Sequence, residues 1–336
     1  MSELVTLDEI LAAKERIAGV AVRTPLYRVA RARLKMAKVA EPEFDLYIKA
    51  ENEQPIGSFK LRGAYNMVAQ LSPEKLQRGV ITYSSGNHAQ GVAYAARALG
   101  AKAVIVMPEN ASEIKKAGAR ALGAEIVTVG PASSERQAKA EEIAEQFGYT
   151  MIPPYDDAAI IAGQATCALE ILEQLPGVDL VIAPVSGGGL LSGIGAGVKL
   201  KAPGVQVWGA EPELAADAKE SFETKRRVKW PAEKTTRTIG DGLRTQSLGA
   251  LNFEHIIKFV DGIVAVSEEE ILSAMRVMLT ATKLVPEPSG AVALAAALYH
   301  AHELPKVRKV AVILSGGNLE PGLRDRLEET SANSRI

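Results

Sequence analysis

Short apolar runs alternate along the chain with longer segments in which apolar positions recur at helical spacing. Three runs, GVITY at 79–83, AKAVIVMP at 101–108 and AEIVTVG at 124–130, are each followed by a segment with a helical pattern. This βαβαβα order is typical of a parallel sheet covered by helices. The alternation resumes with DLVIAPV, VQVWGAEP and KVAVIL. We therefore expect an α/β fold with parallel-rich sheets.

A Pro-rich segment separates the two series of strands. Residues 150–157, TMIPPYDD, show neither a strand nor a helix pattern of apolar positions. They predict a crossover between two lobes. The chain of 336 residues also exceeds the roughly 250–300 residues at which one hydrophobic core stops growing. Two lobes are the expected organisation.

Composition and charge favour small-molecule chemistry. Hydrophobic residues make up 47% of the chain, and the net charge of −1 gives no attraction for nucleic acid or an anionic membrane. The N-terminus has the wrong charge pattern for a signal peptide, and no apolar run approaches a membrane span. The single cysteine, Cys167, excludes an intrachain disulfide. We expect a cytoplasmic protein.

Polar and glycine-rich motifs follow three of the expected strands. SSGNH comes after GVITY, SGGGL after DLVIAPV, and SGGN after KVAVIL. Ligands of open parallel sheets bind beyond the carboxyl ends of the strands. The three motifs are therefore expected to line one site.

The run Ser186–Leu190, SGGGL, lies between a strand and a helix, where glycines expose successive backbone N–H groups at a helix N-terminus. Such a loop binds phosphate, although a simple tight turn is the alternative. No dinucleotide or P-loop fingerprint occurs in the chain. A smaller phosphorylated ligand fits better.

The segment EQPIGSFKLRGA at 53–64 places Lys60 beside an aromatic residue near a helix start. It resembles the lysine segment of fold-type II pyridoxal-phosphate enzymes, in the threonine dehydratase and serine racemase group. Four further motifs match that group in order: SSGNHAQG at 84–91, SGGGL, EPSGA at 287–291 and SGGN at 315–318.

The resemblance implies a two-lobed enzyme with residues 1–72 plus 157–336 as a large cofactor-binding domain and residues 73–156 as a small mobile domain. It implies a homodimer acting on a small amino acid. It also implies that Lys60 holds pyridoxal 5'-phosphate covalently, with the other cofactor contacts made by Phe59, Asn87, Gly187, Gly188, Gly189, Leu190 and Ser315. Substrate contacts fall on Ser58, Ser84, Asn87 and His88. One departure is Ser186, because the family's loop often has a fourth glycine there.

The favoured reaction is dehydration and deamination of L-threonine or L-serine to a 2-oxo acid and ammonia, with Lys60 also serving as the α-proton base. Serine racemase with dehydratase side activity and 3-hydroxyaspartate dehydratase are the alternatives. Ser85 bears on this choice, since racemisation needs a second catalytic acid/base opposite Lys60; a serine that only shapes its loop is the other interpretation. A nicotinamide oxidoreductase and a non-catalytic binding protein are rivals from other classes.

Two carboxylates six residues apart follow the strand VQVWGA. Glu211, Asp217 and the carbonyl of Ala215 offer oxygen ligands of the type that hard divalent cations take. The serine racemase type has metal ligands at this spacing. We expect a structural or activating site for Mg²⁺, Ca²⁺ or Mn²⁺, with an acidic solvated turn as the alternative.

Overall fold

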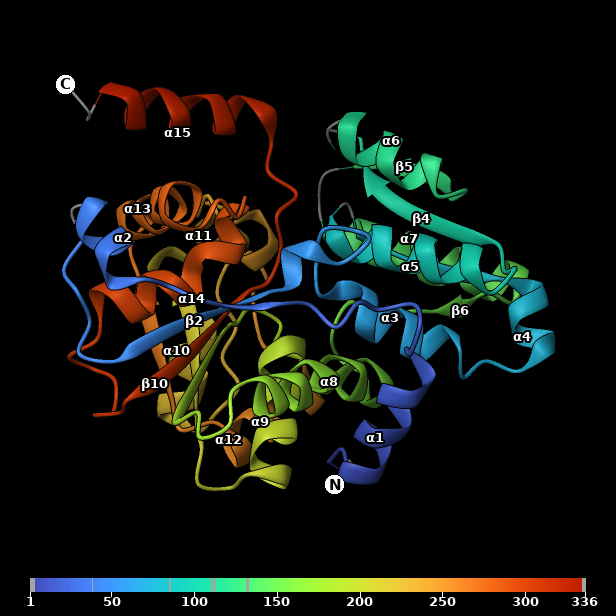
Figure 1. The fold of residues 1–336 in the computed structure, drawn as a ribbon. Coiled ribbons are helices and arrows are strands. Elements are labelled where there is room, and N and C mark those ends of the chain that lie inside the picture. The colour runs from blue at the N-terminus through green and yellow to red at the C-terminus, as the bar shows by residue number, and fades with distance from the viewer. Residues whose placement is uncertain are drawn as a thin grey trace.

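Two parallel-rich sheets form the framework of the molecule. The computed structural model describes residues 4–37, 39–84, 86–109, 111, 113–130 and 133–333. Figure 1 shows one lobe around a six-stranded sheet and a second lobe around a four-stranded sheet. The α/β fold expected from the sequence is confirmed.

The larger sheet has the strand order β1-β2-β10-β7-β8-β9. Its edge strand β1 pairs antiparallel with β2, and the other pairs are parallel. The short antiparallel edge strand was not predicted. The strands are β1 (Leu26–Arg28), β2 (Asp45–Ala50), β7 (Leu180–Pro184), β8 (Gln206–Pro212), β9 (Gly262–Val266) and β10 (Lys309–Leu314).

The smaller sheet has the order β5-β4-β3-β6, and all its pairs are parallel. Its strands are β3 (Val80–Thr82), β4 (Ala103–Pro108), β5 (Glu125–Val129) and β6 (Thr150–Met151). The helices of the chain are α1 (Leu7–Arg16), α2 (Arg31–Met36), α3 (Lys60–Val68), α4 (Pro73–Arg78), α5 (Asn87–Ala98), α6 (Glu113–Ala121), α7 (Ser133–Phe147), α8 (Ala158–Gln174), α9 (Gly189–Lys201), α10 (Asp217–Thr224), α11 (Ala232–Thr235), α12 (Ala250–Phe259), α13 (Glu268–Val277), α14 (Pro288–Tyr299) and α15 (Pro321–Asn333).

Alternate residues of the central strands enter two different cores. On β10, Val310 and Val312 pack with residues of α13 and α14, whereas Ala311 and Ile313 pack with residues of α8 and α9. Side chains of a strand alternate between the two faces of its sheet, so helices on both faces leave the strand apolar throughout. This explains why the parallel strands appear as continuous apolar runs in the sequence.

The helix that begins at Lys60 packs against both lobes. Its Ala64 and Val68 lie in the core of the four-stranded sheet with Val80 and Ile105. The same helix also packs against α8, which covers the larger sheet. The boundaries of two domains at residues 72/73 and 156/157 stay a prediction. Within the described residues, no helix is long and apolar enough to cross a membrane.

Candidate active site

Two of the sequence motifs lie side by side at the start of α3. Gly57 has a φ of +72° and turns the chain, and its carbonyl accepts a hydrogen bond from the Gly317 N–H at 2.9 Å. The Phe59 N–H donates to the carbonyl of Ser315 at 3.0 Å. The predicted lysine segment and the SGGN motif are therefore joined by backbone hydrogen bonds, although more than 250 residues separate them in the sequence.

The Lys60 amine is largely buried, and no carboxylate among the described residues contacts it. Its Nζ donates to the carbonyl of Pro154 at 2.6 Å and lies 5.3 Å from the centre of the Phe59 ring. Burial lowers the pKa of Lys60 to about 8. A lysine with a lowered pKa has a larger neutral fraction near neutral pH, and only the neutral amine is a nucleophile or a base.

Asn87, at the start of α5, is held by two side chains from the other lobe. Its Nδ2 donates to Glu287 Oε1 at 2.6 Å, and its Oδ1 accepts from Asn318 Nδ2 at 2.7 Å. Glu287 is buried, and burial together with Asp241 raises its pKa to about 7. Three predicted motifs therefore meet in this contact.

Glu287 and Asn318 were not among the residues predicted for the site. Both lie in motifs that had been recognised: Glu287 opens EPSGA before the Pro that starts α14, and Asn318 closes SGGN after β10. The signal available was a polar residue directly before a helix for Glu287, and a polar residue in the short loop after a buried strand for Asn318. The motifs could be found from the sequence, but the contact between their side chains could not.

The glycine loop lies against Tyr155. A Cβ on Gly187 would come within 2.5 Å of the Tyr155 ring, and one on Gly189 would come within 2.9 Å of Tyr155 Cβ. Gly188 has a φ of +102°, in the region that favours glycine. It precedes α9, whose first N–H groups have no side-chain cap. The loop thus combines helix-terminal N–H groups that lack a side-chain cap with positions that exclude side chains, as an anion-binding turn requires.

Ser186 connects the glycine loop to a neighbouring segment of the larger lobe. Its Oγ lies 2.6 Å from Thr245 Oγ1 and accepts from the Thr245 N–H at 3.2 Å. The carbonyl of the next residue, Gly187, accepts from the Gly249 N–H at 3.0 Å. The hydroxyl of Ser186, where the family often has glycine, therefore adds a side-chain link to Thr245, and the backbone of Gly187 joins the loop to Gly249.

The predicted substrate residues have different surroundings. Ser58 is fully buried, and its Oγ has no hydrogen-bond partner among the described residues. Ser84 Oγ accepts from the Gly86 N–H at 3.3 Å. His88 Nε2 donates to the carbonyl of Ile152 at 3.0 Å, and burial, followed by the charge of Lys60, lowers its pKa to about 3. His88 is therefore neutral. Ser85 lies outside the described residues.

A buried ionic network is centred on Arg62, two residues after Lys60. The guanidinium of Arg62, which is 0% exposed, donates to both oxygens of Glu51 at 2.7 and 2.8 Å and to both oxygens of Glu170 at 2.7 and 2.8 Å. Lys49 Nζ contacts Glu170 Oε2 at 2.5 Å. Burial alone would raise the pKa of Glu51, but Arg62 outweighs it and holds that pKa below its ordinary value. The network we call the Arg62 cluster consists of Lys49, Glu51, Arg62 and Glu170.

A second buried cluster contains only acids. Glu211, at the end of β8, accepts from the N–H groups of Ala218 and Lys219 at 3.2 and 3.0 Å. Asp217 is 1% exposed, and neither of its carboxylate oxygens has a hydrogen-bond partner among the described residues. Burial raises the pKa of both groups, that of Asp217 to about 7, and Asp217 adds to the increase at Glu211. We call Glu211 and Asp217 the acidic pair.

The acidic pair fits the predicted ligand set. An isolated buried carboxylate is costly unless a cation compensates it, and Mg²⁺ and Ca²⁺ prefer carboxylate and carbonyl oxygens. Ala215, whose carbonyl was the third predicted ligand, is buried in the 3₁₀ turn Glu213–Ala215 between the two acids. The donor set therefore suits a hard divalent cation.

Known proteins resemble this chain over most of its length. Residues 17–316 match the family of pyridoxal-phosphate dependent enzymes. The L-threo-3-hydroxyaspartate ammonia-lyase of Saccharomyces cerevisiae is 39% identical over 94% of this chain and 94% of its own. The serine racemase of Schizosaccharomyces pombe is 38% identical over 94% of this chain and 95% of its own.

A solved structure gives the same result for the fold. The crystal structure of the threonine deaminase of T.th. superposes with a TM-score of 0.86 at 45% identity, covering 94% of this chain and 99% of that one. The matching segment includes Lys60, the glycine loop and Ser315. The chain therefore belongs to the family of pyridoxal-phosphate dependent enzymes.

Proposed function

We propose that this chain is a pyridoxal-phosphate-dependent ammonia-lyase that dehydrates and deaminates L-threonine or L-serine to a 2-oxo acid and ammonia. The observation that carries the proposal is the buried Lys60 amine, whose pKa is lowered to about 8 and which has no acidic partner among the described residues. Relatives that resemble this chain over most of their length include a threonine deaminase and a 3-hydroxyaspartate ammonia-lyase.

The residues around Lys60 fit a phosphorylated aldehyde cofactor. The glycine loop offers backbone N–H groups to a phosphate, and Gly187 and Gly189 lie where a side chain would collide with Tyr155. Lys60 supplies the amine for covalent attachment, and Ser315, which is buried after β10, supplies a neutral hydroxyl for the ring nitrogen. When bound, the cofactor supplies a conjugated ring that accepts the electron pair left by loss of the α-proton.

The chain itself contributes positioning and proton transfer. Lys60 removes the α-proton, because a neutral amine beside the α-carbon is a competent base. The unpartnered hydroxyl of Ser58 and the Ser84–His88 segment hold the substrate carboxylate by hydrogen bonds. Asn87, fixed by Glu287 and Asn318, presents its side chain to the cofactor from the small lobe. Neutral His88 supports the loop through Ile152 and takes no proton.

Serine racemisation and 3-hydroxyaspartate dehydration are the alternative activities. They are supported by relatives of nearly equal identity that carry these two names. Racemisation needs an acid/base on the face opposite Lys60, which is the role open to Ser85. A homodimer and a cytoplasmic location stay predictions from the sequence.

The acidic pair, with the carbonyl of Ala215, is proposed to bind Mg²⁺, Ca²⁺ or Mn²⁺. Two buried carboxyl groups with raised pKa values, which form no ion pair with a cationic side chain among the described residues, support this proposal. The bound cation is predicted to have a structural or activating role, because its ligands are not among the residues around Lys60.

Lys60→Ala is the central test. We expect turnover of L-threonine to fall by about 10²- to 10⁴-fold or more, because the base and the covalent anchor are lost together. Borohydride reduction followed by mass spectrometry should find the cofactor on Lys60 of the wild type and nowhere on the variant. Lys258→Ala, on the exposed side of α12, is the matched control and should keep both properties. Full activity of Lys60→Ala would remove the basis of the proposal.

A substrate panel separates the alternatives. The holoenzyme is incubated with L-threonine, L-serine, D-serine or L-threo-3-hydroxyaspartate, and 2-oxo acid and enantiomer composition are measured. The proposal expects fastest 2-oxo acid release from L-threonine or L-serine. Faster release from 3-hydroxyaspartate, or D-serine formation that Ser85→Ala abolishes, would favour the corresponding alternative.

A further inference from the structure

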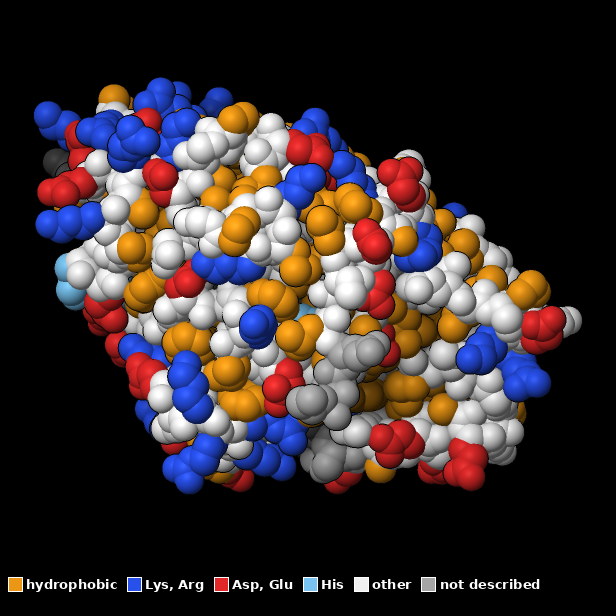
Figure 2. All heavy atoms as spheres, turned by 90° about the horizontal axis from the view of Figure 1, so that it is seen from below, with side chains coloured by type: hydrophobic (Ala, Val, Ile, Leu, Met, Phe, Trp, Pro, Cys, Tyr) orange, Lys and Arg blue, Asp and Glu red, His pale blue; other side chains and the backbone are white. Residues whose placement is uncertain are grey.

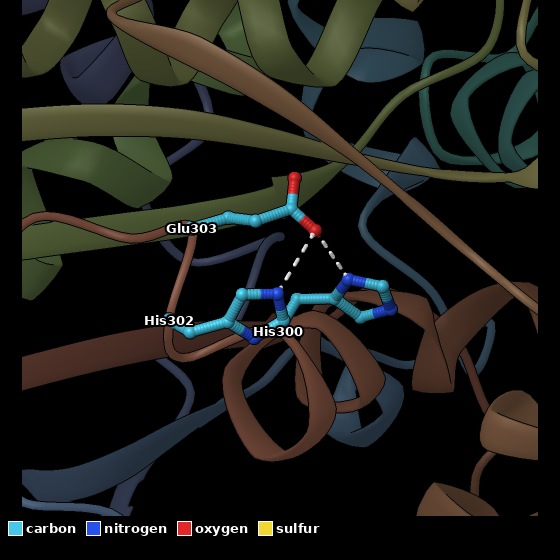
Figure 3. Close-up of side chains that lie close together, drawn as sticks. All are labelled: His300, His302 and Glu303. Carbon is cyan, nitrogen blue, oxygen red and sulfur yellow. Dashed lines mark hydrogen bonds and ion pairs between the residues drawn. The ribbon is translucent and has the colours of Figure 1, made fainter.

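A turn at the end of α14 brings two histidines and a glutamate together, in a part of the larger lobe that the proposed reaction does not use. His300 is the C-cap residue of α14, and the Glu303 N–H donates back to the His300 carbonyl at 2.9 Å. This turn folds the Glu303 side chain over the imidazoles of His300 and His302. Figure 3 shows the Glu303 carboxylate between the two rings.

The donor atoms lie close enough together to reach the spacing of metal ligands. One ligand atom from each of the three side chains lies within 4.8 Å of the other two. Glu303 Oε1 is 2.6 Å from His300 Nδ1 and 3.9 Å from His302 Nε2. In a tetrahedral zinc site with bonds of about 2.1 Å, neighbouring ligand atoms are about 3.4 Å apart. The two distances lie on either side of this value, so small side-chain rotations would bring the three atoms to the spacing of zinc ligands.

His300 is also oriented as metal-bound histidines are. Its second ring nitrogen, Nε2, lies 3.1 Å from Glu270 Oε2. Glu270 is fixed in turn, because the same oxygen accepts from the Ser267 N–H at 2.8 Å in the capping box of α13. A carboxylate behind the second nitrogen sets the ring orientation of a ligating histidine and raises its basicity. His300 Nδ1 is thereby directed toward Glu303.

The cluster is accessible and its position suits a cation. The side chain of His302 is 75% exposed and that of Glu303 is 38% exposed. Figure 2 shows histidine atoms at the surface of the larger lobe, at the left edge of the view. The carbonyl groups at the end of α14 carry partial negative charge, which favours a bound cation. The other two histidines of the chain, His88 and His255, are buried.

We propose that His300, His302 and Glu303 form a binding site for a first-row transition-metal dication such as Zn²⁺, with Glu270 orienting His300. Two imidazole nitrogens and one carboxylate select Zn²⁺, Ni²⁺ or Cu²⁺ over Mg²⁺ and Ca²⁺, which prefer oxygen. A water completes the tetrahedron. The site is separate from the acidic pair, whose donors are all oxygens.

The test is calorimetric titration of the holoenzyme with Zn²⁺, using protein without a histidine tag and with Mg²⁺ in excess to fill the acidic pair. We expect one Zn²⁺ per chain at this site, and His302→Ala should weaken it at least ~10-fold. Glu270→Gln should weaken it by about 10–100-fold while keeping the capping box, in which glutamine replaces glutamate. His302 is exposed, so its replacement leaves folding intact.

Glu145→Ala, which removes an exposed carboxylate of α7, is the matched control and should leave Zn²⁺ binding unchanged. An increase in melting temperature on addition of Zn²⁺, present in the control and absent in His302→Ala, is the second expected result. The proposal is overturned if the wild type binds no Zn²⁺ under these conditions. It is equally overturned if His302→Ala and Glu303→Ala bind Zn²⁺ as tightly as the wild type, because the ion then lies elsewhere.

Discussion

The Arg62 cluster and the acidic pair are both buried, but they differ in their balance of charge. In the Arg62 cluster two cations face two anions, and each oxygen of Glu51 and Glu170 accepts at least one hydrogen bond. In the acidic pair two carboxyl groups share a site, and the oxygens of Asp217 have no hydrogen-bond partner among the described residues. The pKa of Glu51 is accordingly lowered, whereas that of Asp217 is raised.

This difference distinguishes a self-compensated structural element from the site that we propose to bind a cation. Charges buried together with their counter-ions need nothing further, and removing one member leaves another uncompensated. Charges buried without counter-ions destabilise the fold unless they bind protons or a cation. Burial of an ionisable group does not by itself indicate a binding site. A buried ionisable group that forms no ion pair is the better indication.

The largest expected effect comes from opening the Arg62 cluster. Arg62→Met should lower the free energy of unfolding by about 3–5 kcal/mol, because it leaves Glu51 and Glu170 buried with only Lys49 to compensate them. Urea unfolding of the holoenzyme measures the loss. Arg28→Met removes the exposed ion pair with Asp45 and should cost under about 1 kcal/mol. Equal losses in the two variants would show that burial of the cluster adds nothing.

Adding a cation to the acidic pair should have the next largest effect. At 100 times its dissociation constant, Mg²⁺ should stabilise the protein by about 2.7 kcal/mol, measured from thermal or urea unfolding. Asp217→Asn should abolish this gain, because one of the two charged ligands is lost. Glu213→Gln changes an exposed acid in the same turn and should keep the gain. A wild type indifferent to Mg²⁺, Ca²⁺ and Mn²⁺ would refute the site.

The pH dependence of stability should run in opposite directions for the two clusters. The pKa of Asp217 is raised from 3.8 to about 7, so the metal-free folded protein binds more protons there than the unfolded chain. Its contribution is fully present below the unfolded pKa and is lost as pH rises through about 7. Glu51, with a lowered pKa, instead contributes above its unfolded pKa and loses its contribution as pH falls.

The measurement is the stability of wild type minus that of Asp217→Asn, in a chelator, between pH 4 and pH 8. This difference should decrease as pH rises, and saturating Mg²⁺ should remove the trend. Glu287, whose pKa is also raised to about 7, is present in both proteins and cancels. Because Asp217 also raises the pKa of Glu211, the difference reports on both members of the acidic pair, and a flat difference would contradict their raised pKa values.

The smallest expected effect concerns Cys167, beside the Arg62 cluster. Burial, with the nearby charge of Glu51, raises the pKa of its thiol well above the ordinary value. The native protein should therefore resist an aromatic disulfide reagent at pH 8 and react fully in denaturant. Cys167→Ala should cost only about 1 kcal/mol, because it removes one buried atom from a packed helix face. Rapid labelling of the native thiol would indicate that this region opens.

The sequence predicted what short stretches of chain determine. Strands such as β10 are buried on both faces and read as apolar runs, and the glycine loop that follows β7 contains Gly188, whose positive φ few other residues adopt. Contacts between residues far apart in the chain could not be predicted from the sequence. Asn87 lies 200 residues from Glu287 and 231 from Asn318, and no local pattern specifies that these side chains meet.

Buried charge was equally hard to foresee. Lys49, Glu51 and Arg62 are hydrophilic residues that a hydropathy pattern assigns to the surface, yet all three are fully buried. Their partner Glu170 lies more than 100 residues away on α8. Lys60 itself was found by its neighbours in the motif, whereas its contact with the Pro154 carbonyl depends on the crossover between the lobes.

Helix α14 joins two distant places in the molecule, with Glu287 before its first residue and His300 after its last. Twelve residues of α-helix hold these ends about 18 Å apart. Cu²⁺ bound at His300 and His302 would therefore be a paramagnetic reference point at a fixed distance from Glu287, which accepts the hydrogen bond of Asn87. Its effect on the nuclear relaxation of the smaller lobe would report how far that lobe moves when substrate is added.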